Sequence, residues 1–178
     1  GVLQKWSMAR WRGEDCQAED LKVEYEQQWA DRQQDTVIPW KQSEAKERDT
    51  AWNSLEHYLA ETPIAADERP VAVEVRAEAD LSRHGLPKLI GFMDLVRPGG
   101  VIVDYKSSGK TPNAEQVLHQ HETQLSCYGM LYRDATDQTE GGFELHHLVR
   151  TKTPKVIVTE ALLMTNDQQA RLFRAIES

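Results

Sequence analysis

Residues 91–106 constrain the fold of this chain most, because they have the pattern of two apolar strands joined by a tight turn. Strand formers such as Val, Ile and Phe surround a Pro-Gly-Gly turn at 98–100, and Pro and Gly are turn residues. A three-residue hairpin loop sets a register in which Asp94 lies directly opposite Asp104. The sequence therefore predicts a hairpin that carries two adjacent carboxylates.

The predicted hairpin also places an ammonium group beside the carboxylates, because Lys106 projects from the same face as Asp104. Two carboxylates among apolar residues repel each other and resist burial. A divalent cation removes this conflict, and oxygen ligands select Mg²⁺ or Mn²⁺. The lysine could then orient a water or stabilise charge on a phosphate. The alternative is a surface ion pair, but Asp94 and Asp104 both interrupt apolar runs, which favours a metal site.

A second polar group lies on the predicted helix 111–132, which Thr111 could cap with Pro112 in its first turn. Gln124 and Tyr128 are four residues apart and share one face of this helix. They interrupt a largely apolar stripe, so they could reach back toward the hairpin. Ordinary hydrogen bonding at a helix edge is the alternative interpretation.

The remaining pattern predicts an α+β or α/β fold around one mixed sheet. A helical region at 1–64 precedes a core at 65–178, and together they form one structural domain. The alternation of Val71, Val73 and Val75 with other residues predicts a strand. We expect helices at 2–11, 18–31, 43–61 and 166–176, and strands from 71, at 89–96, from 101, at 143–150 and at 155–163. The first three strands would form an antiparallel meander.

The order of these elements resembles the RecB-like branch of the PD-(D/E)XK nuclease superfamily. The matching features are Asp94 on one strand, Asp-Tyr-Lys at 104–106 on the next, and Gln-x-x-x-Tyr at 124–128 on the following helix. The resemblance extends loosely over residues 71–164. It implies a restriction-endonuclease-like core, a mixed central β-sheet flanked by helices.

The resemblance also implies roles for the matched residues. Asp94, Asp104 and the backbone carbonyl of Tyr105 would bind Mg²⁺ or Mn²⁺, and Lys106 would position or activate the attacking water. The reaction would be hydrolysis of DNA phosphodiester bonds, more in keeping with an exonuclease of recombination, repair or phage DNA processing than with an endonuclease.

The resemblance gives supporting roles to further residues. Gln124 and Tyr128 would support the site and contact the phosphate backbone. Glu74 could be an accessory carboxylate, although a solvent-facing position is equally compatible with its strand. The loop residues that could contact phosphates are Ser107, Ser108 and Lys110, and a plain loop is the alternative.

Two departures from the family pattern are visible. RecB-like members usually carry a His ligand on an early helix, and this chain begins with a helical pattern that would follow that position, so we expect it to lack the ligand. His57 is a poor substitute. The two cysteines, Cys16 and Cys127, do not match the four-cysteine pattern of relatives that bind an iron–sulfur cluster, so none is expected. Zinc is not expected either, because neighbouring histidines face apart, namely His119 with His121 and His146 with His147.

The net charge of −8 lowers the expected non-specific affinity for DNA without excluding a nuclease. No apolar run is long enough for a membrane helix, and no signal-peptide pattern is present, so we expect the cytoplasm of a bacterial or phage-infected cell. The alternative functions are a catalytically impaired nucleic-acid-binding or assembly domain on the same fold, and a phosphate-handling metalloenzyme of another fold. The sequence leaves open DNA versus RNA, a helicase or recombination partner, and a homo-oligomer.

Overall fold

The computed structural model describes residues 1–35 and 39–177. Its α-helices are α1 (Val2–Arg12), α2 (Ala18–Asp35), α3 (Glu44–Glu61), α4 (Ala114–Thr136) and α5 (Asn166–Glu177). Its strands are β1 (Ala72–Ala79), β2 (Leu89–Arg97), β3 (Val101–Ser108), β4 (Gly142–Val149) and β5 (Lys155–Ala161). Short 3₁₀ turns, η1 (Ser82–His84) and η2 (Pro98–Gly100), flank β2.

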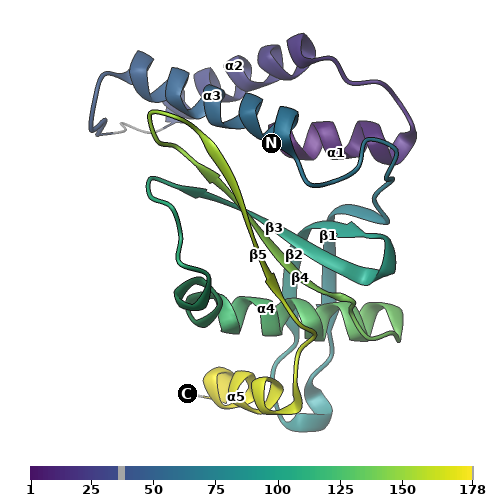
Figure 1. The fold of residues 1–178 in the computed structure, drawn as a ribbon. Helices are drawn as coiled ribbons and strands as arrows, with labels where there is room; N and C mark the ends of the chain where they lie inside the picture. The colour runs from purple at the N-terminus through teal and green to yellow at the C-terminus, as the bar shows by residue number, and fades with distance from the viewer. Residues whose placement is uncertain (36–38, 178) are drawn as a thin grey trace.

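The sheet is mixed and lies between two layers of helices (Figure 1). Its strand order is β1-β2-β3-β4-β5, with β3 and β4 parallel and the other pairs antiparallel. A parallel pair needs a long crossover, and α4 provides it. Helices α1 and α3 contact the sheet from one side, α4 contacts it from the other, and α5 packs on α4. The predicted mixed α+β sheet with flanking helices is confirmed.

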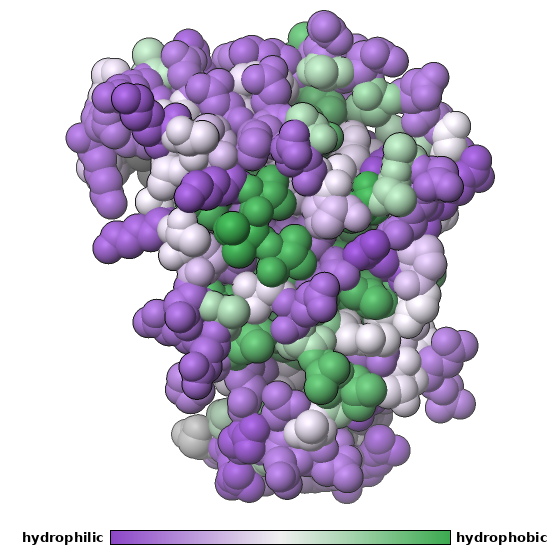
Figure 2. All heavy atoms as spheres, viewed as in Figure 1, coloured by the Kyte–Doolittle hydropathy of each residue, from purple (hydrophilic) through white to green (hydrophobic). Residues whose placement is uncertain are grey.

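Figure 2 shows how polarity is distributed over one face of the molecule. Hydrophilic residues cover the N-terminal helices at the top and the α5 end at the bottom, and apolar residues gather between them. None of the helices in the described part of the chain is long and apolar enough to cross a membrane.

The β2–β3 hairpin has the register that the sequence predicts. Arg97 pairs with Val101 and Leu95 pairs with Val103. Gly100 in the turn has φ = 77°, and a Cβ at this position would lie 2.6 Å from the Tyr132 hydroxyl. A side chain is therefore excluded here both by backbone conformation and by space.

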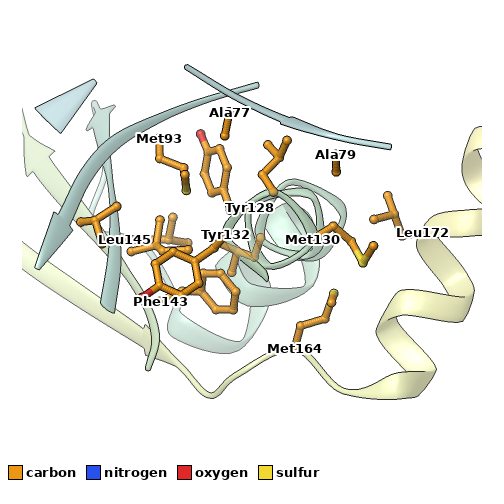
Figure 3. Packing of buried hydrophobic residues seen from close by; sticks show 14 of the residues in the cluster. Ala77, Ala79, Met93, Tyr128, Met130, Tyr132, Phe143, Leu145, Met164 and Leu172 are labelled. Carbon is orange, nitrogen blue, oxygen red and sulfur yellow. The ribbon is translucent and has the colours of Figure 1, made fainter. Parts of the chain in front are cut away.

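The largest apolar cluster surrounds α4 (Figure 3). Tyr128 points from α4 toward Ala77 and Met93 of the β1–β2 pair, and Met164 and Leu172 approach α4 from the other side. Leu131 and Leu145 at the centre of the cluster are at most 1% exposed. This packing sets α4 firmly against the hairpin, which determines where its polar residues lie.

The strand predicted from Val71, Val73 and Val75 is present as β1, but its valines do not share one face. Val71 is 58% exposed, and Val73 packs with Ile64 on the side of the N-terminal helices. Val75 packs against the α4 cluster on the opposite side. The physical reason is the backbone of Glu74, whose φ of 46° lies in the left-handed region. The side chains after Glu74 therefore point to the opposite face from those expected, although the pairing with β2 keeps the same register on both sides.

The start of α4 also differs from the prediction. Asn113, not Thr111, is the N-cap, and its side-chain oxygen accepts the Gln116 N–H at 3.0 Å. Asn is among the strongest N-cap residues. The helix therefore begins at Ala114, after Pro112.

Candidate active site

The hairpin brings Asp94 and Asp104 together at the point where its backbone pairing stops. The β2–β3 ladder ends at Leu95 and Val103, so the next residue on each strand is an aspartate. Beyond the ladder, the Tyr105 N–H donates to Asp94 Oδ2 at 3.0 Å. A side chain thus replaces a backbone carbonyl as the acceptor, and this bond holds the Asp94 carboxylate beside Asp104.

Helix α4 contributes two donors to Asp104. The Tyr128 hydroxyl donates to Asp104 Oδ1 at 2.8 Å, and Gln124 Nε2 donates to the same oxygen at 3.0 Å. Gln124 Oε1 accepts from Lys106 Nζ at 2.9 Å. This orientation of the amide satisfies both neighbours, because an ammonium only donates and a carboxylate only accepts. The structure therefore brings together all five residues that the sequence singled out.

Lys106 and Asp104 form a partly buried ion pair. Lys106 Nζ lies 2.7 Å from Asp104 Oδ2, and the two side chains are 23% and 5% exposed. Asp104 Oδ2 is nevertheless without a hydrogen-bond partner among the described residues, so the contact is one of charge and not of hydrogen-bond geometry. The oxygen is thus buried and lacks a hydrogen-bond donor among the described residues, with the Lys106 ammonium against it.

Burial and neighbouring charges shift the protonation of this group. Burial raises the pKa of Asp94, and the negative charges of Asp104 and Glu74 add to the rise, while the Tyr105 N–H and Lys106 oppose it. Burial also raises the pKa of Tyr128, and the charge of Asp104 adds to that rise. Tyr128 therefore keeps its proton and remains a donor to Asp104.

Glu74 lies level with the two aspartates. Its neighbours Val73 and Val75 pair with Leu95 and Met93, so Glu74 faces Asp94 across the β1–β2 pair. The acidic residues at 74, 94 and 104 thus form a row across three strands. At Glu74 the backbone is left-handed, and the valines on either side of it pack on opposite faces of the sheet.

A cavity of about 520 Å³ opens over the row of acidic residues. Its floor includes Glu74, Asp94 and Lys106, and Ser107 and the Tyr105 backbone lie beside them. Its opposite wall comes from the N-terminal helices and includes Gln4, Tyr25, Gln28, Arg32 and Leu55. The cavity is therefore built from both parts of the chain.

Sequence reasoning missed the residues of the helical wall and one neighbour of Lys106. Arg32 and Gln28 stand on a polar helix far from the hairpin in the sequence, so no local pattern indicates them. His147 is the register partner of Lys106 in the parallel β3–β4 pair. Burial lowers the pKa of His147, and the charges of His121 and Lys106 lower it further.

The other residues considered from the sequence lie outside this cluster. Ser107 and Ser108 lie at the end of β3 and not in the predicted loop, and Ser108 bonds to the backbone of Lys110 in the exposed segment that follows. His57 lines a different cavity, beside β5. His146 is buried between Tyr58 and Glu144, on the face of β4 opposite His147. The two cysteines, Cys16 and Cys127, are free and pack on different clusters.

The donors present fit a hard divalent cation. The carboxylates of Asp94 and Asp104 share a partly buried position, and Asp104 Oδ2 has no hydrogen-bond partner in the described part of the chain. Mg²⁺ needs only one or two carboxylates, since it keeps several waters. Within residues 1–35 and 39–177, no group of three or more His, Cys, Asp or Glu side chains is placed to hold a metal. Any ion here would therefore depend on this pair and on backbone or water oxygens.

Comparison with known proteins adds independent findings. The sequence profile of the family described as "PD-(D/E)XK nuclease superfamily" matches residues 1–178. The chain is also similar to a crystal structure from Eubacterium rectale described as "Putative exonuclease", with 13% identity and a TM-score of 0.58 over 99% of this chain and 63% of that one. At this identity the likeness shows the fold, and the chain spans less than two thirds of that structure. No curated protein matches the chain.

Proposed function

Because the chain belongs to the PD-(D/E)XK nuclease superfamily, we propose that it hydrolyses the phosphodiester bonds of DNA with a divalent cation, Mg²⁺ or Mn²⁺, held by Asp94 and Asp104. The observation that carries this proposal is the hydrogen-bonded set of Asp104, Lys106, Gln124 and Tyr128 beside Asp94. These residues match the family motif in kind and order.

The protein's own residues would prepare the site for the reaction. The Asp94 and Asp104 carboxylates and the Tyr105 carbonyl would hold the cation. When bound, such an ion polarises a phosphate oxygen and lowers the pKa of a water. Lys106 would place its ammonium against the attacking water or the phosphate, where it would stabilise the negative charge that develops in the transition state.

Gln124 and Tyr128 would keep Lys106 and Asp104 in place during the reaction. Gln124 contacts both groups through the two ends of one amide, so a shift of either would break a hydrogen bond. Tyr128 holds the Oδ1 atom of Asp104, which leaves Oδ2 for the cation. Glu74 would serve as an accessory carboxylate at the end of the row.

We propose an exonuclease rather than an endonuclease, with a role in recombination, repair or phage DNA processing. The description of the Eubacterium rectale structure supports this choice. The expectation of a helicase partner or a homo-oligomer stays a prediction.

One observation favours a second candidate, a nucleic-acid-binding or assembly domain with impaired catalysis. Among the described residues, no third His, Cys, Asp or Glu joins the two aspartates in a metal-binding group. Weak cation binding would lower the rate of hydrolysis without preventing binding of DNA. The two candidates differ in whether the chain cuts DNA at all.

The test is a cleavage assay with linear and circular DNA, single- and double-stranded, in Mg²⁺ or Mn²⁺. Lys106→Ala should lower kcat/KM on the order of 10³-fold, because it removes charge stabilisation in the transition state. Lys88→Ala is the matched control, since Lys88 is exposed, lies in the connection between β1 and β2, and within the described residues forms an ion pair with Glu78 alone. It should cut DNA like the parent.

Each outcome separates the candidates. If Lys106→Ala cuts as fast as the parent, the assignment of the site is wrong. If the parent binds DNA and cuts none with either ion, the binding domain is the better description. Cutting of circular DNA at the rate of linear DNA would contradict the exonuclease proposal.

A further inference from the structure

A second cavity, also of about 520 Å³, lies between the start of α3 and the β4–β5 turn. Three cationic side chains line it: Lys46 from α3, and Arg150 and Lys152 from the turn. Its other polar lining residues are neutral, namely Gln42, Thr50, Asn53 and Thr151. We call this cavity the basic groove.

The charge of the basic groove is not compensated within the described residues. Lys46, Arg150 and Lys152 form no ion pair there, and no Asp or Glu lines the groove. The nearby Glu44 accepts from Trp29 Nε1 at 2.6 Å and from Gln33 Nε2 at 2.9 Å, so its carboxylate turns toward α2. A concave site with three free cations in a chain of net charge −8 fits a polyanion.

The basic groove and the cavity over the acidic row lie next to each other along the end of β4. Leu148 and Ser107 line the active-site cavity, and Arg150 lies two residues beyond Leu148, about 7 Å along an extended chain. The Arg150 N–H donates to the Ser108 carbonyl at 2.7 Å, which ties the two strand ends together. Figure 1 shows the β4–β5 turn and the loop after β3 on the same side of the molecule, below the first turns of α3.

From this placement we infer that the basic groove binds the sugar–phosphate backbone of a single DNA strand whose adjoining phosphodiester occupies the active site. The inference rests on the nuclease function proposed above. The position of the groove next to the active site favours a nucleic-acid strand over a free phosphate or an acidic protein, because a strand cut in the active site extends beyond it and can occupy both cavities. Lys and Arg contacts to phosphates bind without regard to sequence.

The inference predicts a dependence on strand length and on salt. Binding of two oligothymidylates is measured by fluorescence anisotropy with a chelator present, so that neither is cut. One is short enough to fill only the active-site cavity, and the other is several times longer. For the long strand, Arg150→Gln/Lys152→Gln should weaken binding and lower the slope of log K against log salt by about 1.4, since each lost phosphate contact contributes about 0.7. Lys46→Gln should lower it by about 0.7.

The matched control is Arg83→Gln/Arg174→Gln. Both of these arginines are exposed and form no ion pair among the described residues, and they lie on η1 and α5, at the opposite end of the molecule from α3 (Figure 1). This pair removes the same charge and should leave the salt slope unchanged. Equal losses with both pairs would mean that only net charge matters, and would overturn the inference.

Strand length and cleavage give independent readouts. An equal loss of affinity for the short and the long strand, or no loss for either, would also overturn the inference. If the parent cuts DNA but the groove variants bind the long strand like the control pair, the groove inference alone fails. If the parent binds the long strand through the groove but cuts nothing, the nuclease proposal alone fails.

Discussion

The N-terminal helices and the sheet with α4 have cores of different chemistry. The cluster around α4 is built from aliphatic side chains, Met, Tyr and Phe contributed by four strands and two helices. The cluster of the N-terminal helices is smaller and rich in aromatic residues, with Tyr25 and Trp52 at its centre and Trp6 and Trp29 packed against it. The larger core supports the proposed catalytic residues, and the smaller one supports the opposite wall of their cavity.

The junction between the two regions combines the apolar cluster of Ile64, Leu95 and Val103 with a chain of polar side chains. The Tyr58 hydroxyl lies 2.7 Å from His146 Nδ1, and His146 Nε2 lies 2.7 Å from Glu144. Arg97 makes paired hydrogen bonds with Glu144 and with Glu68. Apolar surfaces can shift against each other at little cost, whereas a network of side-chain hydrogen bonds requires a defined geometry. These directional contacts, together with the apolar cluster, fix the position of the helical wall over the acidic row.

Of the predicted changes, removal of the Arg97 guanidinium from the junction should lower the free energy of unfolding most. Arg97→Met leaves the carboxylates of Glu68 and Glu144 partly buried without their counter-charge, which should cost about 3–5 kcal/mol in the free energy of unfolding. The control is Arg76→Met, because Arg76 pairs with Glu78 in an exposed position and such pairs contribute about 1 kcal/mol or less. Urea denaturation measures both. Similar midpoints for the two variants would contradict a structural role for the junction.

Truncation of one leucine in each core tests whether the two regions unfold together. Leu131 and Leu21 are each 1% exposed, so Leu131→Ala and Leu21→Ala should each cost about 2–5 kcal/mol. All five Trp residues lie in the first 52 positions, so Trp fluorescence reports on the helical region, while far-UV circular dichroism reports on the whole chain. We expect the two transitions to coincide in both variants. An earlier fluorescence transition in Leu21→Ala would show that the helical region unfolds on its own.

Deletion of one hydroxyl at the junction should have a smaller effect. Tyr58→Phe leaves the buried Nδ1 of His146 without its partner, which should cost about 1–3 kcal/mol. Tyr128→Phe instead removes the hydroxyl that donates to Asp104 in the proposed active site. We expect the first variant to lose mainly stability and the second to lose mainly cleavage rate, as thermal unfolding and the DNA assay would show. The reverse pattern would contradict the division of roles between the two regions.

Mild acid should have the smallest effect, and should act on the junction. Hydrogen bonds from Arg97 lower the pKa of Glu68. Burial would raise the pKa of Glu144, but hydrogen bonding to His146 and the charge of Arg97 outweigh it and lower that pKa. Both carboxylates therefore stabilise the fold fully above their ordinary value of 4.5, and this stabilisation is lost as pH falls below 4.5 through the lowered values. The urea midpoint of the parent should fall in this range more steeply than that of Arg97→Met. Parallel curves would contradict the prediction.

The arrangement of Asp104, Lys106, Gln124 and Tyr128 was predictable because its signals are local. The three-residue turn sets the β2–β3 register, and the side-chain alternation of a strand puts Lys106 on the face of Asp104. The helical period puts Gln124 and Tyr128 on one face in the same way. Alternation failed at Glu74, because a single left-handed residue reverses the faces of a strand and leaves no mark in a pattern of apolar residues.

The sequence by itself determined the main helices and strands, the hairpin register next to the turn, and the faces that carry Asp104, Lys106, Gln124 and Tyr128. These follow from turn chemistry and from periods of two and 3.6 residues, which act over short stretches of chain. Only the tertiary structure decided that Arg32 lines the cavity over the acidic row and that Lys46 and Arg150 line one groove. It also decided that His146 contacts both Tyr58 and Glu144. Such contacts depend on how whole faces pack together, and packing selects partners by shape and space across long separations in the chain.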